Sequence, residues 1–225
     1  MKKNKKVFLA IDTNNISIAK KIIFDSKTSK LKIGYKFGLE FFNSKKGRNF
    51  ISKLKKKTIF IDLKLNDIPK TMSATLMALK DLRINYFTVH ISSGLKALKE
   101  VKKISGKTKI VGVTTLTSLD SKDLQSIGFS RSVKSLVLYQ TKIAKKANLD
   151  AIVCSPHEVE NVKKIFKGEV ITPGIRLNEN KNDQKRIMSP YRAFLKGSDW
   201  LVIGRSITKG NIKKNLKKLL DNLYL

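Results

Sequence analysis

The chain has 225 residues, and 41% of them are hydrophobic, which is enough for a sizeable core and excludes a disordered protein. Its single cysteine, Cys154, excludes an internal disulfide framework and fits a reducing compartment. The net charge of +31, from 48 basic and 17 acidic residues, attracts anions. Because the basic residues are mostly lysine and are spread along the chain, we interpret them as a lysine-rich surface and predict no specific nucleic-acid partner.

The N-terminal stretch MKKNKKVFLAID begins with basic residues, as a signal peptide does. Its apolar run, residues 7–11, is too short for the hydrophobic part of a signal peptide. No other apolar run is long enough for a membrane span. We therefore expect a cytoplasmic protein that does not associate with membranes.

Eight short apolar segments recur at fairly even intervals and predict eight β-strands. Several are apolar at successive residues, as is typical of strands that are buried on both faces. Segments with helical periodicity separate most of them, such as 16–23, 72–79 and 133–147. The predicted strands are residues 7–12, 31–37, 58–64, 86–90, 109–115, 150–155, 169–174 and 200–205.

Strands that alternate with helices in a chain of this length predict a single (β/α)8 barrel of the TIM type over residues 1–225. A doubly wound open sheet is the alternative, but the glycine fingerprint of dinucleotide-binding sheets follows none of the predicted strands. The C-terminal segment 211–225 places leucines at helical spacing opposite a face of lysines. We interpret this segment as the last outer helix of the barrel, with a helix on a membrane surface as the alternative.

Barrel enzymes carry their active residues at the carboxyl ends of the strands and in the loops that follow. In this sequence, charged or polar residues occupy most of those positions. A purely structural barrel would not need that pattern. The candidates are Asp12, Lys32, Asp62, Lys64, Asp67, Thr117, Arg176, Gly204 and Arg205.

The stretch DLKLNDIPKT, residues 62–71, concentrates unlike charges at the end of the third predicted strand. Side chains two apart on a strand point to the same side, so Asp62 and Lys64 project together. Charge at a shielded strand end is costly unless it is paired, and nearby carboxylates favour the ammonium form of Lys64. A fixed ammonium can donate a proton or stabilise an adjacent anion by roughly 4 kcal/mol. These letters alone also allow a structural ion-pair network.

The eighth predicted strand ends at Gly204 and Arg205, where a helix begins. Glycine allows close approach of a ligand, a helix start attracts phosphate, and arginine adds a charged contact. We therefore favour a phosphate site over a plain surface turn at this place, where barrels often bind phosphate. The polar segment 176–183 is either a lid over that phosphate or a surface loop.

Metal binding has little support in the sequence. His90 and His157 stand apart, and neither belongs to a metal-binding spacing. Cys154 lies in an apolar run. We interpret all three as structural residues and predict no metal site.

The motifs DLKLNDIPKT, VTTLTS, TPGIR, DQKR and VIGRSIT, in this order, resemble those of the orotidine 5′-phosphate decarboxylases. The resemblance extends from LAID near the N-terminus to the eighth predicted strand. It implies a homodimer that converts orotidine 5′-phosphate to uridine 5′-phosphate and CO2, the last step of pyrimidine nucleotide synthesis. It also implies that no metal or other cofactor takes part.

The resemblance implies a catalytic role for three residues of DLKLND. Lys64 would donate a proton to the pyrimidine carbon that loses CO2. Asp62 would lie beside the departing carboxylate. Asp67 would reach into the neighbouring subunit's site and complete its charged network.

The same resemblance implies substrate contacts for the other matched residues. Lys70 departs from the family pattern, since an uncharged polar residue such as asparagine is common there. The implied contacts are Asp12 and Lys32 at the ribose hydroxyls, Thr117 at the pyrimidine, Ile68, Pro69 and Thr71 in the loop after the third strand, and Arg176, Gln184, Gly204 and Arg205 at the phosphate and lid.

Two other functions are kept as alternatives. Magnesium-dependent sugar-phosphate barrels, such as keto-gulonate phosphate decarboxylases and hexulose phosphate synthases, share the aspartate–lysine–aspartate strand, although DQKR and LTS argue against them. A nucleic-acid binder driven by charge is the other alternative. No clustered arginine and aromatic motif supports it.

Overall fold

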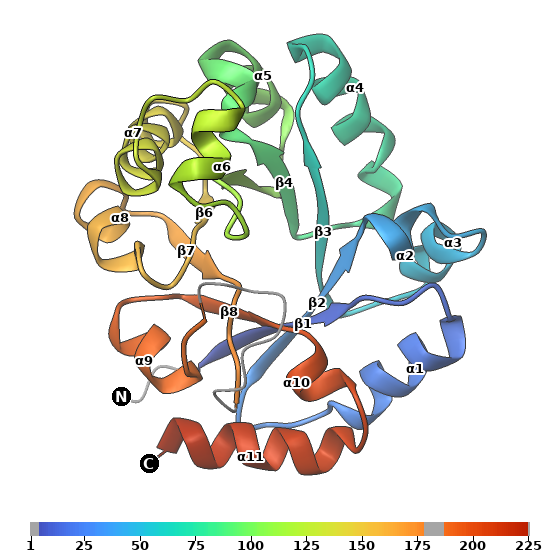
Figure 1. The fold of residues 1–225 in the computed structure, drawn as a ribbon. Coiled ribbons are helices and arrows are strands. Elements are labelled where there is room, and N and C mark those ends of the chain that lie inside the picture. The colour runs from blue at the N-terminus through green and yellow to red at the C-terminus, as the bar shows by residue number, and fades with distance from the viewer. Residues whose placement is uncertain (1–4, 178–186, 225) are drawn as a thin grey trace.

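The computed structural model describes residues 5–177 and 187–224, and these form a closed barrel of eight parallel strands (Figure 1). Each strand pairs with its neighbours in the sequence, and β1 pairs with β8 to close the barrel. The predicted (β/α)8 barrel is therefore confirmed. The strands are β1 Lys6–Ile11, β2 Lys32–Gly38, β3 Thr58–Leu65, β4 Tyr86–His90, β5 Lys109–Val113, β6 Ala151–Val153, β7 Glu169–Thr172 and β8 Trp200–Ile203.

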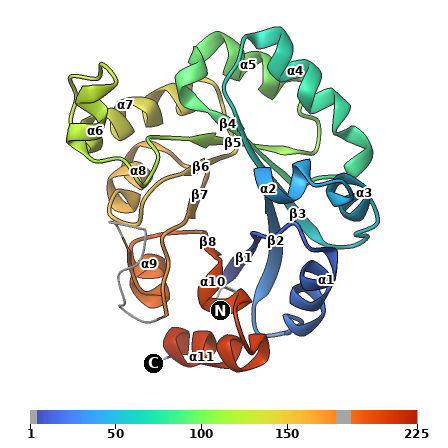
Figure 2. The ribbon, with the colours of Figure 1, turned by 45° about the vertical axis from the view of Figure 1, so that its right-hand side comes forward.

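Helices form an outer ring around the strands, as the turned view also shows (Figure 2). None of them, in the part of the chain that the structure describes, is long and apolar enough to span a membrane. The helices are α1 Ile16–Asp25, α2 Leu39–Asn43, α3 Gly47–Ser52, α4 Pro69–Ala78, α5 Gly94–Ile104, α6 Ser121–Ser126, α7 Val133–Lys146, α8 Val159–Ile165, α9 Pro190–Leu195, α10 Arg205–Thr208 and α11 Ile212–Tyr224, with 3-10 turns η1 Lys80–Leu82 and η2 Ile91–Ser93.

The last helix, α11, docks on the barrel as the sequence predicts. Its apolar stripe of Ile212, Leu216, Leu219 and Leu223 is buried, and it packs against α1, α9 and α10. The lysines of its other face are exposed. A helix that buries one stripe in this way gains its stability from tertiary packing.

Five of the predicted strands, β1 and β5 to β8, extend one or two residues too far at their carboxyl ends. The extra residues, among them Asp12, Thr115 and Gly204, begin the loops that follow the strands. Apolar runs predict buried backbone, but they do not show where the hydrogen-bonded ladder ends. The overrun residues lie at the functional end of the barrel.

Aromatic side chains fill the inside of the barrel toward the amino ends of the strands. Phe8 stacks on Trp200 with ring centroids 4.0 Å apart, and Phe60 and Tyr86 pack against the Phe8 ring. Gly34 faces this cluster, where an added Cβ would lie 2.5 Å from Cε1 of Phe8. The lower part of the barrel interior is therefore solid, and the interior has space for a ligand near the carboxyl ends of the strands.

Glu169 lies below the aromatic cluster, with its carboxylate surrounded by donors. Lys6, Lys109 and the Tyr86 hydroxyl each donate to it at 2.8 Å, and the Trp200 indole donates at 3.3 Å. Burial alone would raise the pKa of the Glu169 carboxyl, but the hydrogen bonds from Lys109, Lys6 and Tyr86 lower that pKa to about 2. Burial and the Glu169 carboxylate together raise the pKa of the Tyr86 phenol.

We predict that Glu169 makes folding stability depend on pH between about 4.5 and 2. Because its folded-state pKa lies below the ordinary value of 4.5, its contribution is fully present above pH 4.5 and is lost as the pH falls towards 2. The shift corresponds to at most about 3 kcal/mol in the free energy of unfolding.

The test is urea unfolding of wild type, Glu169→Gln and Glu100→Gln from about pH 6 to about pH 2.5. Glu100 is exposed and serves as the matched control. Wild type and Glu100→Gln should lose stability in parallel, and Glu169→Gln should show a shallower dependence on pH. Equal pH dependence in all three proteins would contradict this role for Glu169.

Candidate active site

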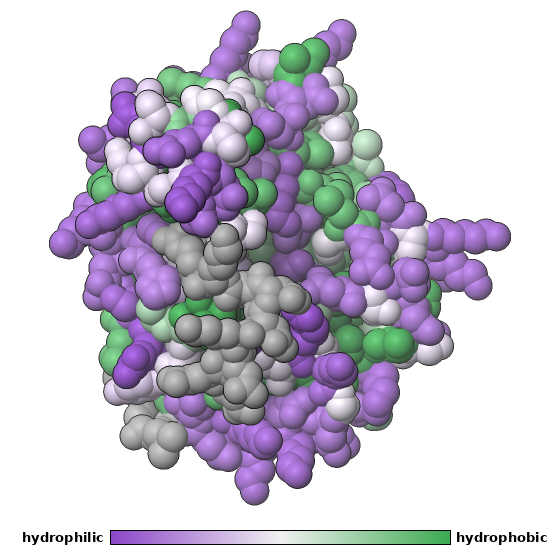
Figure 3. Space-filling model, viewed as in Figure 1, coloured by the Kyte–Doolittle hydropathy of each residue, from purple (hydrophilic) through white to green (hydrophobic). Residues whose placement is uncertain are grey.

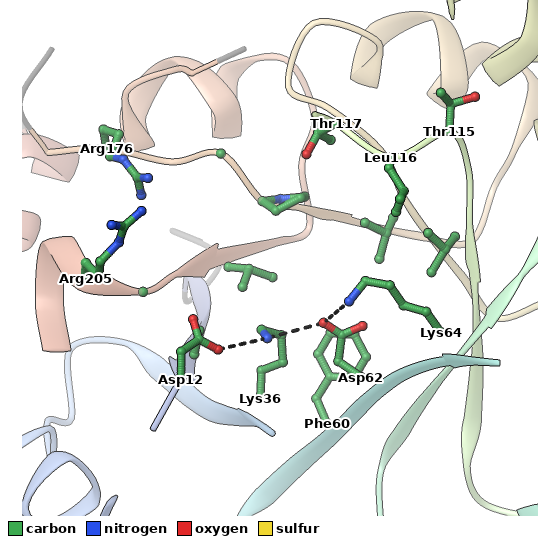
Figure 4. A pocket seen from close by; sticks show the side chains of 17 residues that line it. Asp12, Lys36, Phe60, Asp62, Lys64, Thr115, Leu116, Thr117, Arg176 and Arg205 are labelled. Carbon is green, nitrogen blue, oxygen red and sulfur yellow. Dashed lines mark hydrogen bonds and ion pairs between the residues drawn. The ribbon is translucent and has the colours of Figure 1, made fainter. Parts of the chain in front are cut away.

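A cavity of about 280 Å³ opens at the carboxyl ends of the strands (Figure 4). Apolar residues of the barrel interior, including Ala10, Val113 and Val202, line it between two charged ends. Figure 4 shows Asp62 and Lys64 at one end and Arg176 and Arg205 at the other. The cavity thus has a mixed-charge end and an end that carries two arginines.

A single carboxylate joins two ammonium groups at the first end. Oδ2 of Asp62 lies 2.9 Å from Nζ of Lys64 and 3.2 Å from Nζ of Lys36. Lys36 also lies 3.5 Å from Oδ1 of Asp12. Lys36 lies on β2, Asp62 and Lys64 lie on β3, and Asp12 directly follows β1. These three strands are neighbours in the barrel, and Gly38 pairs with Asp62 in register.

Burial and charge act in opposite directions on this network. Burial alone would raise the pKa of Asp62, but the ammonium groups of Lys36 and Lys64 outweigh it and hold this pKa below its ordinary value. Burial likewise would lower the pKa of Lys36, and the carboxylates of Asp62 and Asp12 raise it instead. Asp62 and Lys36 therefore stay charged although both are largely shielded from solvent.

The backbone at Lys64 departs from regular strand geometry. Lys64 has φ 51°, in the left-handed region that most residues avoid, and the β3–β4 register shifts between Ile61 and Leu65. The Thr88 hydroxyl on β4 accepts the Lys64 N–H at 2.8 Å and donates to Oδ1 of Asp62 at 3.2 Å. Thr88 is fully buried, so one hydroxyl fixes both the bulge and the carboxylate. The sequence pattern does not point to Thr88, because the role of this residue depends on the bulge.

The cationic end is formed by the segments after β7 and β8. The guanidinium groups of Arg176 and Arg205 point toward each other in Figure 4, and both line the cavity with Gly204. An added Cβ at Gly204 would lie 3.4 Å from Oδ2 of Asp12, so the backbone there passes close to this carboxylate, which also lines the cavity. Two arginines facing one space suit a doubly charged anion such as phosphate.

Thr117 also lines the cavity, on the segment after β5. The neighbouring Thr115 is held by Gln140, whose Oε1 accepts the Thr115 N–H at 2.8 Å. This contact fixes the start of the segment that carries Thr117. The structure therefore brings together Asp12, Asp62, Lys64, Thr117, Arg176, Gly204 and Arg205 from the predicted set.

The loop after β3 lies outside the cavity lining. Asp67 is exposed, and its side chain accepts the Ile68 N–H at 2.7 Å. Ile68 is 64% exposed, Pro69 opens α4, and Thr71 is exposed in its first turn. Hydrophilic residues cover most of the visible face in Figure 3, but hydrophobic atoms appear at the top of the view, where α4 begins in Figure 1.

Lys32 is a wrong prediction. It begins β2 at the opposite end of the barrel, where its ammonium lies 5.9 Å from the Trp200 ring centroid. Lys36 is the β2 lysine that reaches the cavity. Lys32 and Lys36 point to the same side of β2, so the period of two does not show which of them reaches the cavity. Lys36 is nearer the carboxyl end of the strand, and that position distinguishes it from Lys32.

Gln184 and the predicted lid residues from position 178 onward lie outside the described residues. Within 5–177 and 187–224, no group of three or more His, Cys, Asp or Glu side chains could hold a metal ion. His90 is half-buried near the charged network. Burial and the Lys64 ammonium lower its pKa, while the Asp62 carboxylate opposes them.

A family model described as the orotidine 5′-phosphate decarboxylase / HUMPS family matches residues 5–218. The chain is similar to an orotidine 5′-phosphate decarboxylase of Wolbachia sp. subsp. Brugia malayi (strain TRS), with 42% identity over 95% of this chain and 96% of the relative. An orotidine 5′-phosphate decarboxylase of Prochlorococcus marinus (strain MIT 9215) is 43% identical over 91% of this chain and 89% of the relative.

Solved structures show the same likeness in three dimensions. Orotidine 5′-phosphate decarboxylase from Lactobacillus acidophilus matches with a TM-score of 0.84 and 29% identity, over 99% of this chain and 100% of that chain. Orotidine 5′-monophosphate decarboxylase from Methanocaldococcus jannaschii, complexed with the inhibitor BMP, matches with a TM-score of 0.78 and 26% identity over the same shares. The likeness covers every strand that contributes to the cavity.

We predict that Thr88→Val makes the backbone at Lys64 more mobile, because the Lys64 N–H loses its hydrogen bond to the Thr88 hydroxyl. The substitution keeps the shape of the side chain but leaves the Lys64 N–H and one Asp62 oxygen without this partner, at a cost of about 1–3 kcal/mol in unfolding free energy. Amide hydrogen exchange at Lys64 should accelerate in Thr88→Val and stay slow in Thr88→Ser, which keeps the hydroxyl. Full protection of this amide in Thr88→Val would contradict the role of Thr88.

Proposed function

Because the chain belongs to the orotidine 5′-phosphate decarboxylase / HUMPS family and is a carboxy-lyase, we propose that Lys64 is its proton donor in the conversion of orotidine 5′-phosphate to uridine 5′-phosphate and CO2. The observation that carries this proposal is the pairing of Lys64 with Asp62 at one end of a cavity whose other end is cationic. The product, uridine 5′-phosphate, is the nucleotide with which pyrimidine nucleotide synthesis ends.

The chemical difficulty of this reaction is a carbanion. When the bond between the ring carbon and its carboxylate breaks, the electron pair stays on the ring carbon and CO2 leaves. The ring offers that charge no good place to delocalise. An ammonium held in advance beside the carbon stabilises the charge as it forms, and the Lys64 proton then completes the new C–H bond.

Asp62 has two tasks in this proposal. Its carboxylate fixes the Lys64 ammonium at 2.9 Å, so little reorganisation is needed during the reaction. We also propose that the substrate carboxylate binds beside Asp62, so that repulsion between the two carboxylates falls as CO2 leaves. Lys36 balances the charge of Asp62 through an ion pair and forms a second one with Asp12. We assign Lys36 and Asp12 to the ribose hydroxyls.

The phosphate end supplies binding energy away from the reacting carbon. We assign Arg176, Gly204 and Arg205 to the substrate phosphate and Thr117 to the pyrimidine. Contacts far from the reacting bond can order the site around the substrate and hold the ring against Lys64. Gln184 is assigned to the same phosphate from the family resemblance alone.

We propose that the active enzyme is a homodimer in which Asp67 serves the partner's site. Asp67 lies outside the cavity of its own chain, and the neighbouring Ile68 is 64% exposed. An exposed isoleucine beside a carboxylate suits a contact with a second copy. We also propose that the reaction needs no metal or other cofactor and takes place in the cytoplasm.

We predict that Lys64→Ala lowers kcat by at least about a thousandfold, because the fixed ammonium acts mainly on the transition state. Affinity for uridine 5′-phosphate should stay within about tenfold, since the phosphate contacts are intact. Lys32→Ala is the matched control at the other end of the barrel and should keep kcat within about twofold. Near-normal turnover by Lys64→Ala would overturn the assignment.

The shared site predicts complementation between two inactive variants. Lys64→Ala and Asp67→Ala chains, mixed under conditions that exchange subunits, should form hybrid dimers in which one site has both native residues. At random exchange the mixture should regain about a quarter of wild-type activity. If mass spectrometry confirms hybrid dimers and no activity returns, Asp67 does not serve the partner's site.

A further inference from the structure

The positive charge of the loops is distributed unequally between the two ends of the barrel. Around the carboxyl-end cavity, acidic residues interleave with basic ones. Those acidic residues are Asp12, Glu40, Asp67, Asp120, Asp123 and Glu158. At the amino ends of the strands, the loop and strand-start carboxylates are Asp81, Asp150, Glu169 and Asp199, and each already forms an ion pair with a lysine or arginine.

Three neighbouring loops at the amino end carry seven cationic side chains. They precede β3, β4 and β5, which are adjacent in the barrel. Within the described residues, no ion pair joins these side chains to a carboxylate, and all are exposed except the half-exposed Lys57. We call this set the basic arc, and it comprises Lys53, Lys55, Lys56, Lys57, Lys80, Arg83 and Lys107.

A groove of about 460 Å³ lies within the basic arc, between the ends of α4 and α5. These two helices lie side by side in both ribbon views (Figures 1 and 2). Lys80, Arg83 and Lys107 line the groove together with apolar residues such as Leu79 and Ile104, and no acidic residue is among its lining. The groove therefore combines a cationic rim with an apolar floor.

We propose that the basic arc binds the phosphodiester backbone of single-stranded RNA, with one nucleotide unit seated in the groove. Lysine and arginine side chains without carboxylate partners can neutralise phosphates, and the counterions condensed on the nucleic acid are then released. An apolar floor gives a base somewhere to pack. Six of the seven cations are lysines, which contact phosphates as point charges. Phosphate contacts carry no sequence information, so we expect binding that is independent of the RNA sequence.

An anionic membrane surface is the competing partner, and it fits less well. Stable membrane attachment combines lysines with apolar side chains that enter the bilayer interface. None of the large hydrophobic side chains that are exposed in the described chain lies in the three loops of the basic arc. The groove also recedes between two helices, where a flat lipid surface cannot follow it.

The test is fluorescence anisotropy with a labelled oligoadenylate of about 12 nucleotides, a length within the usual footprint of single-strand binding surfaces. Adenine replaces uracil in this probe so that the carboxyl-end cavity is not its target. The assay contains no orotidine 5′-phosphate, and its outcome is therefore independent of the proposed decarboxylation. Binding should weaken steeply as salt is raised.

The deciding variant is Lys80→Gln/Arg83→Gln/Lys107→Gln, compared with Lys213→Gln/Lys214→Gln/Lys217→Gln on α11 as a control of equal charge. Three lost phosphate contacts correspond to about a hundredfold weaker binding at about 0.1 M salt. The control should stay within about threefold. If the first variant does not fold, as judged by circular dichroism, Lys53→Gln/Lys55→Gln/Lys56→Gln replaces it with the same expectation.

Three results would overturn the proposal. Equal weakening in both variants would mean that net charge alone, and not the basic arc, attracts the RNA. Binding of phosphatidylglycerol vesicles without binding of RNA would identify a membrane surface instead. Absence of binding to either probe at low salt would leave the basic arc as a solvated surface.

Discussion

The site depends on one carboxylate that is shared between two ammonium groups. Asp62 is 7% exposed and binds Lys36 and Lys64 through the same oxygen. A buried charge of this kind is stable only when its partners are held in place, and loss of one partner leaves the others uncompensated. The barrel meets this requirement by placing the three residues on adjacent strands and by fixing Asp62 from its other side with Thr88.

The rest of the barrel supports that arrangement. The aromatic cluster closes the amino end of the barrel interior. A ligand therefore enters the interior from the carboxyl end, where the charged network lies. Glu169 pairs with both Lys6 and Lys109 beneath the cluster, so one carboxylate serves two lysines far from the cavity. The same chain thus uses paired charge twice inside one barrel. At the amino end, the ion pairs of Glu169 belong to the packed interior. At the carboxyl end, Lys64 lines the cavity.

Most of the fold and residues at both ends of the site were predictable from sequence. Strand spacing gave the barrel, and the rule that active residues follow strand ends identified Asp62, Lys64, Arg176 and Arg205. Lys36 was missed because period-two alternation places it on the same face as Lys32. Thr88 was missed because a strand bulge, which apolar patterns do not reveal, brings its hydroxyl to the Lys64 amide. Asp67 is outside the cavity of its own chain, where a single sequence cannot show what it meets.

The central claim is that a fixed lysine and its carboxylate partners perform the decarboxylation. The most direct measurement follows the absorbance of orotidine 5′-phosphate after addition of the purified protein and a metal chelator. The account predicts rapid conversion to uridine 5′-phosphate and CO2 with no loss of rate when the chelator is present. No conversion by folded, dimeric protein, or activity that the chelator removes, would contradict it and favour the magnesium-dependent sugar-phosphate chemistry of related barrels.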